Sequence, residues 1–175
     1  MQQSEFLKSC SHWNDHLPLL WLALEETKDS KLPICEFGAG DGSTPYLRQY
    51  CLDNNREFVS YDFNKEWAEK TGSIHIPDWD VADIYKEYSV VLVDESPGEH
   101  RHETLSILKD KALILVVHDS ETPATGYMLN KIWYLFKYRV NLNKDMGGAE
   151  ASAVSNHIDV AKWDGQELAG FKITK

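Results

Sequence analysis

Three glycines at alternate positions, Gly38, Gly40 and Gly42, follow a short apolar run in the segment ICEFGAGDGSTPYL. Their spacing differs from the Gly-x-Gly-x-x-Gly of dinucleotide-binding turns, in which a helix N-terminus receives a pyrophosphate. Glu36 and Asp41 flank the glycines and would repel a diphosphate, so the turn favours a ligand with a positive centre. The alternative is a tight strand-to-helix turn that needs glycine only for steric reasons.

A further acid, Asp62, follows Gly42 at a distance of twenty residues. It ends the predicted strand EFVSYD, where a carboxylate can accept hydrogen bonds from the hydroxyls of a ribose. A ribose site beside a turn that favours a cation fits S-adenosylmethionine, because this nucleoside carries a positively charged sulfonium. We therefore predict that the turn binds S-adenosylmethionine.

A second group of acid–base residues ends two other apolar runs. Asp94 ends YSVVLVD, and His118 and Asp119 end ALILVVHD. If these runs are neighbouring parallel strands, the three side chains meet at one edge of the sheet. A hydroxyl becomes a nucleophile only with the help of a base or a metal ion, so His118 could be a general base oriented by the carboxylates, or all three residues could hold Mg²⁺ or Mn²⁺. In a third interpretation, His118 only satisfies a buried hydrogen bond.

Other polar residues give weaker indications. His12 and His16 are four residues apart, a helical spacing that can bind metal, but no third ligand is evident. Arg101 could pair with Asp94 or with an acidic sugar. The loop KDMGGAEAS, residues 144–152, could be a mobile lid or a substrate loop.

The elements that must position these residues alternate between strand and helix. This alternation occurs five times and predicts a doubly wound α/β sheet, in which ligands bind beyond the carboxyl ends of the strands. The hydrophobic pattern predicts helices at residues 4–28 (interrupted at Pro18), 44–52, 65–70, 98–110 and 126–137. It predicts strands at residues 32–37, 57–62, 72–76, 88–94 and 112–119, with two or three more strands in the C-terminal tail.

Composition limits the partners. The 175 residues include 18 basic and 28 acidic side chains, a formal charge of −10, which disfavours nucleic acid and anionic membrane. No apolar run approaches the ~20 residues that cross a bilayer, and the start MQQSEFLKSCSHWNDH lacks the pattern of a secretory leader. Cys10, Cys35 and Cys51 are odd in number and have no Cys-x-x-Cys spacing, which fits a reducing compartment. We expect a cytoplasmic protein without membrane insertion, and the sequence leaves a homo-oligomer open.

The segment EFGAGDGS followed by SYD resembles motif I and the ribose-binding acid of class I S-adenosylmethionine-dependent methyltransferases, and the likeness continues through VVLVDESPGEHR and ALILVVHDSE. The opening residues and GDGSTPYL resemble the smaller O-methyltransferases of sugars and glycans, with the glucuronoxylan and cephalosporin-hydroxylase-like branches. The resemblance implies a single domain, residues 1–175, with a Rossmann-like class I methyltransferase fold. In this fold a mostly parallel seven-stranded sheet has helices on both faces and an antiparallel last strand. Residues 1–30 would be an N-terminal helical segment and residues 31–175 the Rossmann-like core.

The same resemblance implies site residues. Those expected to bind S-adenosylmethionine are Glu36, Gly38, Gly40, Ser43, Asp62, Asp78 and Trp79. Trp79 could stack on adenine or simply pack against the sheet. Metal-dependent relatives use a carboxylate after the fourth strand and two ligands after the fifth, which correspond to Asp94, His118 and Asp119. Relatives carry an acid in place of His118, so Mg²⁺ or Mn²⁺ would find fewer hard oxygen ligands here.

Together these features predict an S-adenosylmethionine-dependent O-methyltransferase for a hydroxyl of a sugar or glycan, as in polysaccharide biosynthesis, with or without metal. One alternative is a methyltransferase for small molecules of the catechol or antibiotic type. Another is a non-catalytic nucleoside-binding subunit of a glycan-assembly complex. An NAD-dependent oxidoreductase is disfavoured by the glycine spacing.

Overall fold

The computed structural model describes residues 1–10, 14–79, 82, 86–120, 127–143 and 149–175. His12 and the two glycines of the predicted loop at residues 144–152 lie outside this part of the chain. Five α-helices are present in it: α1 (Gln3–Phe6), α2 (Leu17–Glu26), α3 (Thr44–Asp53), α4 (Lys65–Thr71) and α5 (Arg101–Leu108). Short 3-10 turns occur at η1 (Leu7–Ser9), η3 (Gly98–His100), η4 (Leu129–Lys131), η5 (Trp133–Leu135) and η6 (Val160–Trp163).

One sheet forms the centre of the molecule. Its strands are β1 (Ile34–Phe37), β2 (Phe58–Asp62), β3 (Ile74–His75), β4 (Tyr88–Val93), β5 (Ala112–His118), β6 (Tyr138–Asn143), β7 (Ala149–Ser155), β8 (Glu167–Leu168) and β9 (Phe171–Thr174). They lie in the order β3-β2-β1-β4-β5-β7-β6-β9-β8. The first five strands along the chain are parallel, and β7 is antiparallel to β5 and to β6.

This sheet confirms the predicted Rossmann-like methyltransferase fold. An antiparallel last strand was predicted, and the structure has an antiparallel strand, β7, between β5 and β6 and not at the end of the sheet. The predicted number of seven strands is too small, because β9 pairs with β6 and β8 pairs with β9, which extends the sheet to nine strands. The two additional strands come from the tail QELAGFKIT. They are short and are joined by a tight turn in which Ala169 and Gly170 have positive φ angles.

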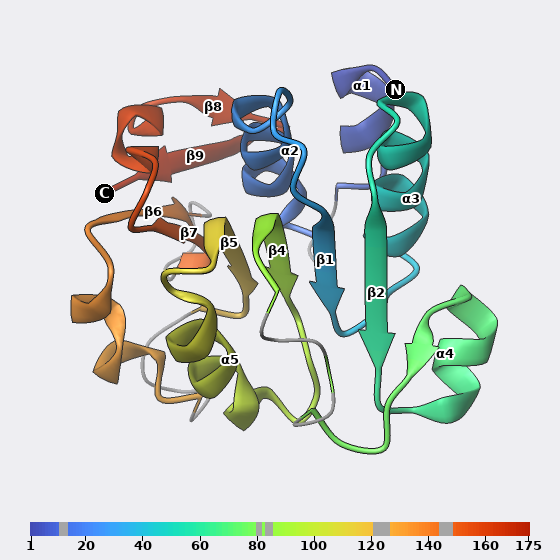
Figure 1. Cartoon of the computed structure of the whole chain (residues 1–175). Helices are drawn as coiled ribbons and strands as arrows, with labels where there is room; N and C mark the ends of the chain where they lie inside the picture. Colours follow the sequence, from blue (N-terminus) through green and yellow to red (C-terminus); the bar gives the residue numbers. More distant parts are fainter. Residues whose placement is uncertain (11–13, 80–81, 83–85, 121–126, 144–148) are drawn as a thin grey trace.

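Residues of the central strands alternate between two apolar cores, as expected for a sheet covered on both faces. Val90 and Leu92 of β4 belong to a core that includes side chains of α1, α2 and α3. Val91 and Val93 belong to the other core, which α5 covers. In Figure 1 the arrows of β1, β2 and β4 point the same way, so their carboxyl ends meet at one edge of the sheet.

Two of the predicted helices differ from the structure. In the predicted helix 4–28, Cys10 and residues 14–16 are not helical although apolar residues recur at helical spacing. The predicted helix at 126–137 is wrong within the described residues, which form only the turns η4 and η5. Residues 132–136 are all apolar or aromatic, so they cannot share one buried face of a helix. The predicted break near Pro18 is confirmed, but it precedes the proline: α2 begins at Leu17, and Pro18 occupies its first turn.

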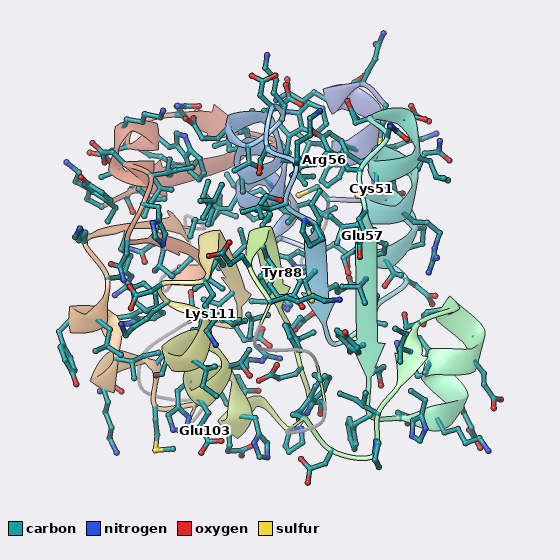
Figure 2. All side chains as sticks on the ribbon, in the orientation of Figure 1. Cys51, Arg56, Glu57, Tyr88, Glu103 and Lys111 are labelled. Atoms are coloured by element: carbon teal, nitrogen blue, oxygen red, sulfur yellow. The ribbon has the colours of Figure 1, made fainter. Side chains whose placement is uncertain are left out.

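At the opposite edge of the sheet, where the strands begin, hydrogen bonds link the residues that precede β1 and β2 to the start of β4. Figure 2 shows Arg56 and Cys51 at this end and Tyr88 at the start of β4. Arg56 donates a hydrogen bond to the Ser89 hydroxyl at 2.5 Å, and the Ser89 hydroxyl donates to the carbonyls before β1. None of the three cysteines forms a disulfide within the described residues, and Cys35 is buried as predicted. No helix in the described part of the chain combines the length and apolarity needed to cross a bilayer.

Candidate functional site

A hollow of about 270 Å³ lies where the carboxyl ends of β1, β2 and β4 meet. Its lining residues are Gly38, Ala39, Asp62, Phe63, Asn64, Trp67, Asp94 and Ser96. Two of these are carboxylates and none is a lysine or arginine. The hollow is therefore suited to a neutral or positively charged ligand, and it occupies the position at which doubly wound sheets bind nucleotides.

In the turn after β1, only some of the three glycine positions exclude a larger residue for steric reasons. Gly38 has a φ of +89°, and a Cβ atom at this position would lie 2.3 Å from the Asp94 carbonyl oxygen. A Cβ at Gly42 would lie 1.7 Å from the Asn14 side chain, which packs against the turn. At Gly40 the nearest atom to such a Cβ is the Ser43 hydroxyl at 3.5 Å, an ordinary contact. Sterics therefore explain Gly38 and Gly42 but not Gly40.

Both backbone groups of Ala39, its amide and its carbonyl, are hydrogen-bonded to side chains that line the hollow. Asp62 Oδ2 accepts a hydrogen bond from the Ala39 amide at 3.0 Å, and the Trp67 indole donates to the Ala39 carbonyl at 2.5 Å. The other oxygen of Asp62 accepts from the Asn64 amide at 2.7 Å. Burial raises the pKa of Asp62, and the two backbone hydrogen bonds oppose this shift. Each carboxylate oxygen can still accept a second hydrogen bond, so the predicted ribose contact remains open to Asp62.

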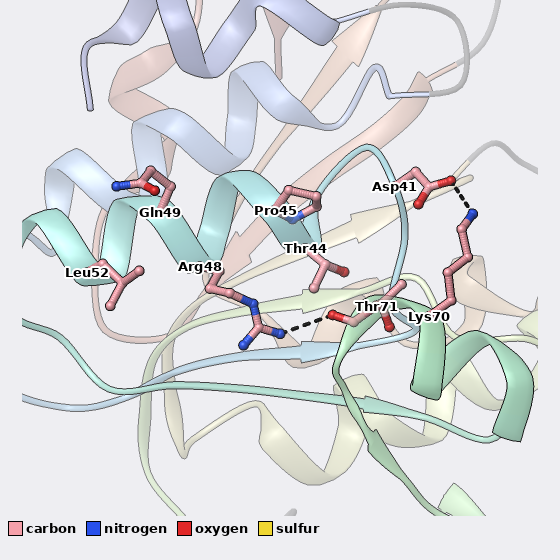
Figure 3. A pocket seen from close by; sticks show the side chains of 8 residues that line it. All are labelled: Asp41, Thr44, Pro45, Arg48, Gln49, Leu52, Lys70 and Thr71. Carbon is pink, nitrogen blue, oxygen red and sulfur yellow. Dashed lines mark hydrogen bonds and ion pairs between the residues drawn. The ribbon is translucent and has the colours of Figure 1, made fainter.

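Helix α4 is fastened to the glycine turn and to α3. The Asn64 side chain caps α4 by accepting from the Trp67 amide. Lys70 forms an ion pair with Asp41 at 2.7 Å, and Arg48 donates to the Thr71 carbonyl. Figure 3 shows the contacts of Lys70 with Asp41 and of Arg48 with Thr71 in a second hollow, between α3 and α4, that shares no lining residue with the first. These contacts fix Trp67, a residue that the sequence analysis did not select, against the turn.

Glu36 lies behind the glycine turn and is fully buried. Its carboxylate accepts hydrogen bonds from the hydroxyls of Ser43 at 2.5 Å, Thr44 at 2.7 Å and Ser60 at 2.6 Å. Burial raises the pKa of Glu36 to about 7, although the three hydroxyls favour its charged form. Glu36 does not line the hollow, and its contacts join β1, β2 and the start of α3.

Three other predicted cofactor residues differ in their exposure. Ser43 is the N-cap residue of α3, but its hydroxyl bonds to Glu36 and not to the helix. Trp79 is buried, packs against Phe37 at 6.2 Å between ring centroids, and donates to the Ser96 carbonyl. Asp78 is exposed. Phe63, which the sequence analysis did not select, is exposed beside Trp79 and offers a ring to the hollow.

The structure brings Asp94, His118 and Asp119 together, as the strand-end argument predicted. Asp94 Oδ1 lies 3.0 Å from His118 Nδ1, and Asp119 Oδ1 lies 3.6 Å from His118 Nε2. Between the two carboxylates lies the guanidinium of Arg101, which donates to Asp94 and to Asp119 at 2.9 Å each. The predicted pairing of Arg101 with Asp94 is therefore confirmed.

Arg101 is buried and fastens the ends of β4 and β5 to each other. Besides the two carboxylates, it donates to the backbone carbonyls of Glu95 at 3.0 Å and His118 at 2.7 Å. Five N–H donors in a planar group suit such a junction better than the single ammonium of lysine. The pKa of Asp94 is affected first by burial, which raises it, but the hydrogen bond and charge of His118 and the charge of Arg101 bring it below its usual value.

The other ring nitrogen of His118 points into a buried cluster. Nε2 lies 3.0 Å from Asp15 Oδ1, and the His16 ring stands edge-on to the His118 ring at 4.7 Å between centroids. In the chain by itself, burial lowers the pKa of His118, but hydrogen bonds to Asp15 and Asp94 outweigh burial and raise it to about 10. Burial and the charge of His118 lower the pKa of His16 to about 4. Neither ring nitrogen of His118 is open to a substrate hydroxyl.

The strand order and the hollow define a class I methyltransferase fold, and comparison with solved structures agrees with this. The chain is similar to the MycE methyltransferase of the mycinamycin biosynthetic pathway, solved with Mg and SAH, with 13% identity and a TM-score of 0.59 over 97% of this chain. It is also similar to the SAH-bound Podospora anserina methyltransferase PaMTH1, with 15% identity and a TM-score of 0.54 over 87% of this chain and 85% of the other. A third similar structure is the hMettl16 catalytic domain in complex with a MAT2A 3'UTR hairpin, with 9% identity and a TM-score of 0.52 over 82% of this chain and 70% of the other.

These similarities establish the fold, since the identities are low. This chain spans 57% of the length of the MycE chain. No protein-family model and no curated protein matches the sequence.

Proposed function

We propose that the chain is an S-adenosylmethionine-dependent methyltransferase acting on a hydroxyl group. The observation that carries this proposal is the hollow at the carboxyl ends of β1, β2 and β4 in a methyltransferase fold, lined by Asp62 and Asp94 and by no cationic side chain. A sulfonium nucleoside matches this lining, whereas a diphosphate would be repelled by it.

Within this proposal, the residues of the hollow have separate tasks. Asp62 accepts hydrogen bonds from the ribose, Phe63 offers its ring to adenine, and the backbone at Gly38 and Gly40 lies against the methionine part of the cofactor. Glu36 and Ser43 act as positioning residues, because their hydrogen bonds hold the turn from behind. Asp78 and Trp79 lie near the adenine end, where Trp79 supports the wall of the hollow through its contact with Ser96.

The reaction is an in-line displacement in which the acceptor oxygen forms a bond to the methyl carbon while the carbon–sulfur bond breaks. Sulfur keeps the electron pair, and the hydroxyl proton passes to a base on the protein. His118 faces Asp94 with one nitrogen and buried Asp15 with the other, so it is better suited to position Asp94 than to accept this proton. Asp119, which is the more exposed of the two strand-end carboxylates, is the base that we propose.

A Mg²⁺ or Mn²⁺ ion held by Asp94, His118 and Asp119 fits the structure poorly. The three residues offer ligand atoms within 4.8 Å of one another, but Arg101 already binds both carboxylates. An ion between them would meet the guanidinium charge. We therefore assign the neutralisation of Asp94 and Asp119 to Arg101 and derive no step through a metal ion at this place.

The acceptor that we propose is a sugar or glycan hydroxyl. Its support is the sequence resemblance and the net charge of −10, which favours a neutral or cationic acceptor. A small aromatic or antibiotic acceptor is the alternative within the same chemistry. The same charge argues against RNA as the acceptor, although one similar structure contains an RNA hairpin.

Calorimetric titration with S-adenosylmethionine and SAH tests the cofactor. We expect micromolar binding of both and none of NAD; a folded protein that binds neither adenosyl compound contradicts the proposal. Transfer of a labelled methyl group to a panel of saccharides, catechols and RNA then identifies the acceptor class. Cofactor binding without transfer to any acceptor would favour a non-catalytic nucleoside-binding subunit.

The substitution Asp119→Asn tests the base. It preserves the size of the side chain and removes the proton acceptor, so we expect methyl transfer to fall by roughly 10²- to 10⁴-fold with the dissociation constant of S-adenosylmethionine unchanged. Lys109 follows the C-terminal end of α5 and contacts Asp110, so the control Lys109→Ala should transfer methyl groups normally. If Asp119→Asn weakens cofactor binding and transfer in parallel, Asp119 is structural and not the base.

A further inference from the structure

We propose that Asp15, His16 and the Nε2 atom of His118 form a binding site for a divalent transition-metal ion. The three side chains are buried, with exposed fractions of 2%, 2% and 9%. Each offers one ligand atom, and these atoms lie within 4.8 Å of one another. This site lies on the side of His118 that faces away from Arg101.

His16 supplies the strongest indication of a ligand. Among the described residues, neither of its ring nitrogens has a hydrogen-bond partner. A buried polar group without a partner costs about 1–3 kcal/mol, so a histidine in this position needs a compensating interaction. The ring stands edge-on to His118, with 4.7 Å between centroids. A metal ion bound to one nitrogen of His16 would supply the missing interaction.

His118 has the hydrogen bonding of a metal ligand. Its Nδ1 atom lies 3.0 Å from Asp94 Oδ1, while Nε2 faces Asp15 Oδ1, also at 3.0 Å. Metal-binding histidines commonly donate their other N–H to a carboxylate, which fixes the ring and makes it a better ligand. Asp94 occupies this supporting position, and Arg101 in turn holds Asp94.

Asp119 is not part of this donor set. Its Oδ1 atom lies 3.6 Å from His118 Nε2, but its other oxygen is paired with Arg101. Two imidazoles with one carboxylate suit Zn²⁺, Fe²⁺, Co²⁺ or Mn²⁺, whereas Mg²⁺ and Ca²⁺ prefer oxygen ligands. The donor set therefore distinguishes this site from the cluster of Asp94, His118 and Asp119 that the family resemblance implied.

The site would join the N-terminal segment to the centre of the fold. Asp15 and His16 immediately precede α2, while His118 ends β5. The neighbouring Asn14 side chain packs against Gly42 of the glycine turn. A bound ion would thus fix the segment that lies on this turn. The inference does not depend on methyl transfer, because it concerns metal binding by the folded chain alone.

Metal titration of the full chain tests the site. After removal of metal with a chelator, we expect one Co²⁺ per chain to bind with a dissociation constant in the micromolar range or below, to give d–d absorption bands of nitrogen and oxygen ligation, and to be displaced by Zn²⁺. Thermal unfolding should shift upward with either ion. Absence of binding to the wild-type protein overturns the proposal, whatever the behaviour of its variants.

Two substitutions make the test specific. His16→Ala should weaken Co²⁺ binding by about 100-fold or more, since it removes a direct ligand. His157→Ala, a histidine that contacts the Asp110 carbonyl outside the cluster, should leave binding unchanged. Circular dichroism checks that His16→Ala is folded; if it is not, Asp15→Asn replaces it with the same expectation. Binding that these ligand variants leave unchanged, or that Asp119→Asn alone abolishes, overturns the assignment.

Discussion

The buried carboxylate of Glu36, in β1, connects this strand to α3 and β2 through hydrogen bonds to its two oxygens. Its oxygens bind hydroxyls from α3 and β2, so the turn that leaves β1 is fixed from behind and not by its own backbone alone. Burial of this acid makes the stability of the fold depend on pH, because the folded chain binds a proton at Glu36 more tightly than the unfolded chain does.

The substitution Glu36→Gln should therefore change the pH dependence of stability. The pKa of Glu36 is about 7 in the fold, above its usual value, so its stabilising contribution is complete below about pH 4.5 and is lost as the pH rises through 7. Relative to Glu36→Gln, the wild type should lose up to about 3 kcal/mol of unfolding free energy across this range. Urea unfolding at several pH values measures the difference. Burial also raises the pKa of Glu95 to about 7, but Glu95 titrates in both proteins, so its contribution cancels.

A difference that stays constant with pH would show that the pKa of Glu36 is the same in the folded and the unfolded chain. Gln is a suitable replacement because it has the same shape and the surrounding hydroxyls can rotate to accept from its amide.

The glycines offer a matched pair of substitutions. Gly38→Ala should destabilise the fold by at least about 2 kcal/mol, because alanine is strained at a φ of +89° and its Cβ would overlap the Asp94 carbonyl. Gly40→Ala meets only an ordinary contact and should leave thermal unfolding nearly unchanged.

Gly40→Ala also tests the predicted closeness of the backbone to the cofactor. If the turn lies against S-adenosylmethionine at Gly40, the variant should bind it at least about tenfold more weakly by calorimetry, because a methyl group occupies the space of the ligand. A stable Gly40→Ala protein with normal affinity would mean that Gly40 does not touch the cofactor.

At the scale of elements, α4 positions one side of the hollow. Trp67→Phe keeps an aromatic ring and removes the hydrogen bond to the Ala39 carbonyl, which should lower stability by about 1 kcal/mol. Affinity for S-adenosylmethionine should fall several-fold, since Ala39 then keeps its hydrogen bond to Asp62 and loses the one to Trp67. Trp163→Phe, at a buried residue of η6 that belongs to the core, is the control whose cofactor affinity should not change. Equal effects of both variants on affinity would assign the loss to general destabilisation.

Sequence patterns predict those elements that have a clear local signal, such as a continuous apolar run or a helix-capping sequence. β4 and β5 are continuous apolar runs, and α3 begins with Ser43, Thr44 and Pro45, so their positions follow from local chemistry. Residues 126–137 have no such signal, and the described part forms 3-10 turns. The strand β8 has only two residues and cannot be distinguished from the neighbouring turn by composition, whereas β9 lies in the tail for which two or three strands were predicted.

The candidate site was predictable only in its strand-end residues. Asp62, Asp94, His118 and Asp119 follow from the rule that parallel strands end at one edge. Asp15 and Trp67 reach the site from other elements through long-range packing, which no local pattern encodes. His16 was a candidate metal ligand from its spacing to His12, but its place beside His118 also depends on long-range packing. The role of Arg101 depends on a register between β4 and β5 that becomes visible only in three dimensions.

For the whole molecule, the charge of −10 adds to the two carboxylates of the hollow in favouring a cationic ligand. We expect S-adenosylmethionine, with its charged sulfur, to bind at least as tightly as SAH at low ionic strength, and this preference to decrease as salt screens the charges. Calorimetry at about 20 mM and about 200 mM NaCl measures the ratio of the two dissociation constants under weak and under strong screening of charge. A tighter binding of SAH that does not vary with salt would show that the acidic lining does not select for the sulfonium.

The outermost strands of the described sheet, β3 and β8, have two residues each. An exposed edge strand is a template on which another chain can add a strand, and a template of this length offers very few backbone groups for pairing. Association of several copies would therefore have to proceed through helical surfaces or loops. Because its edge strands are so short, the protein should also resist the edge-to-edge pairing of sheets that leads to fibrils.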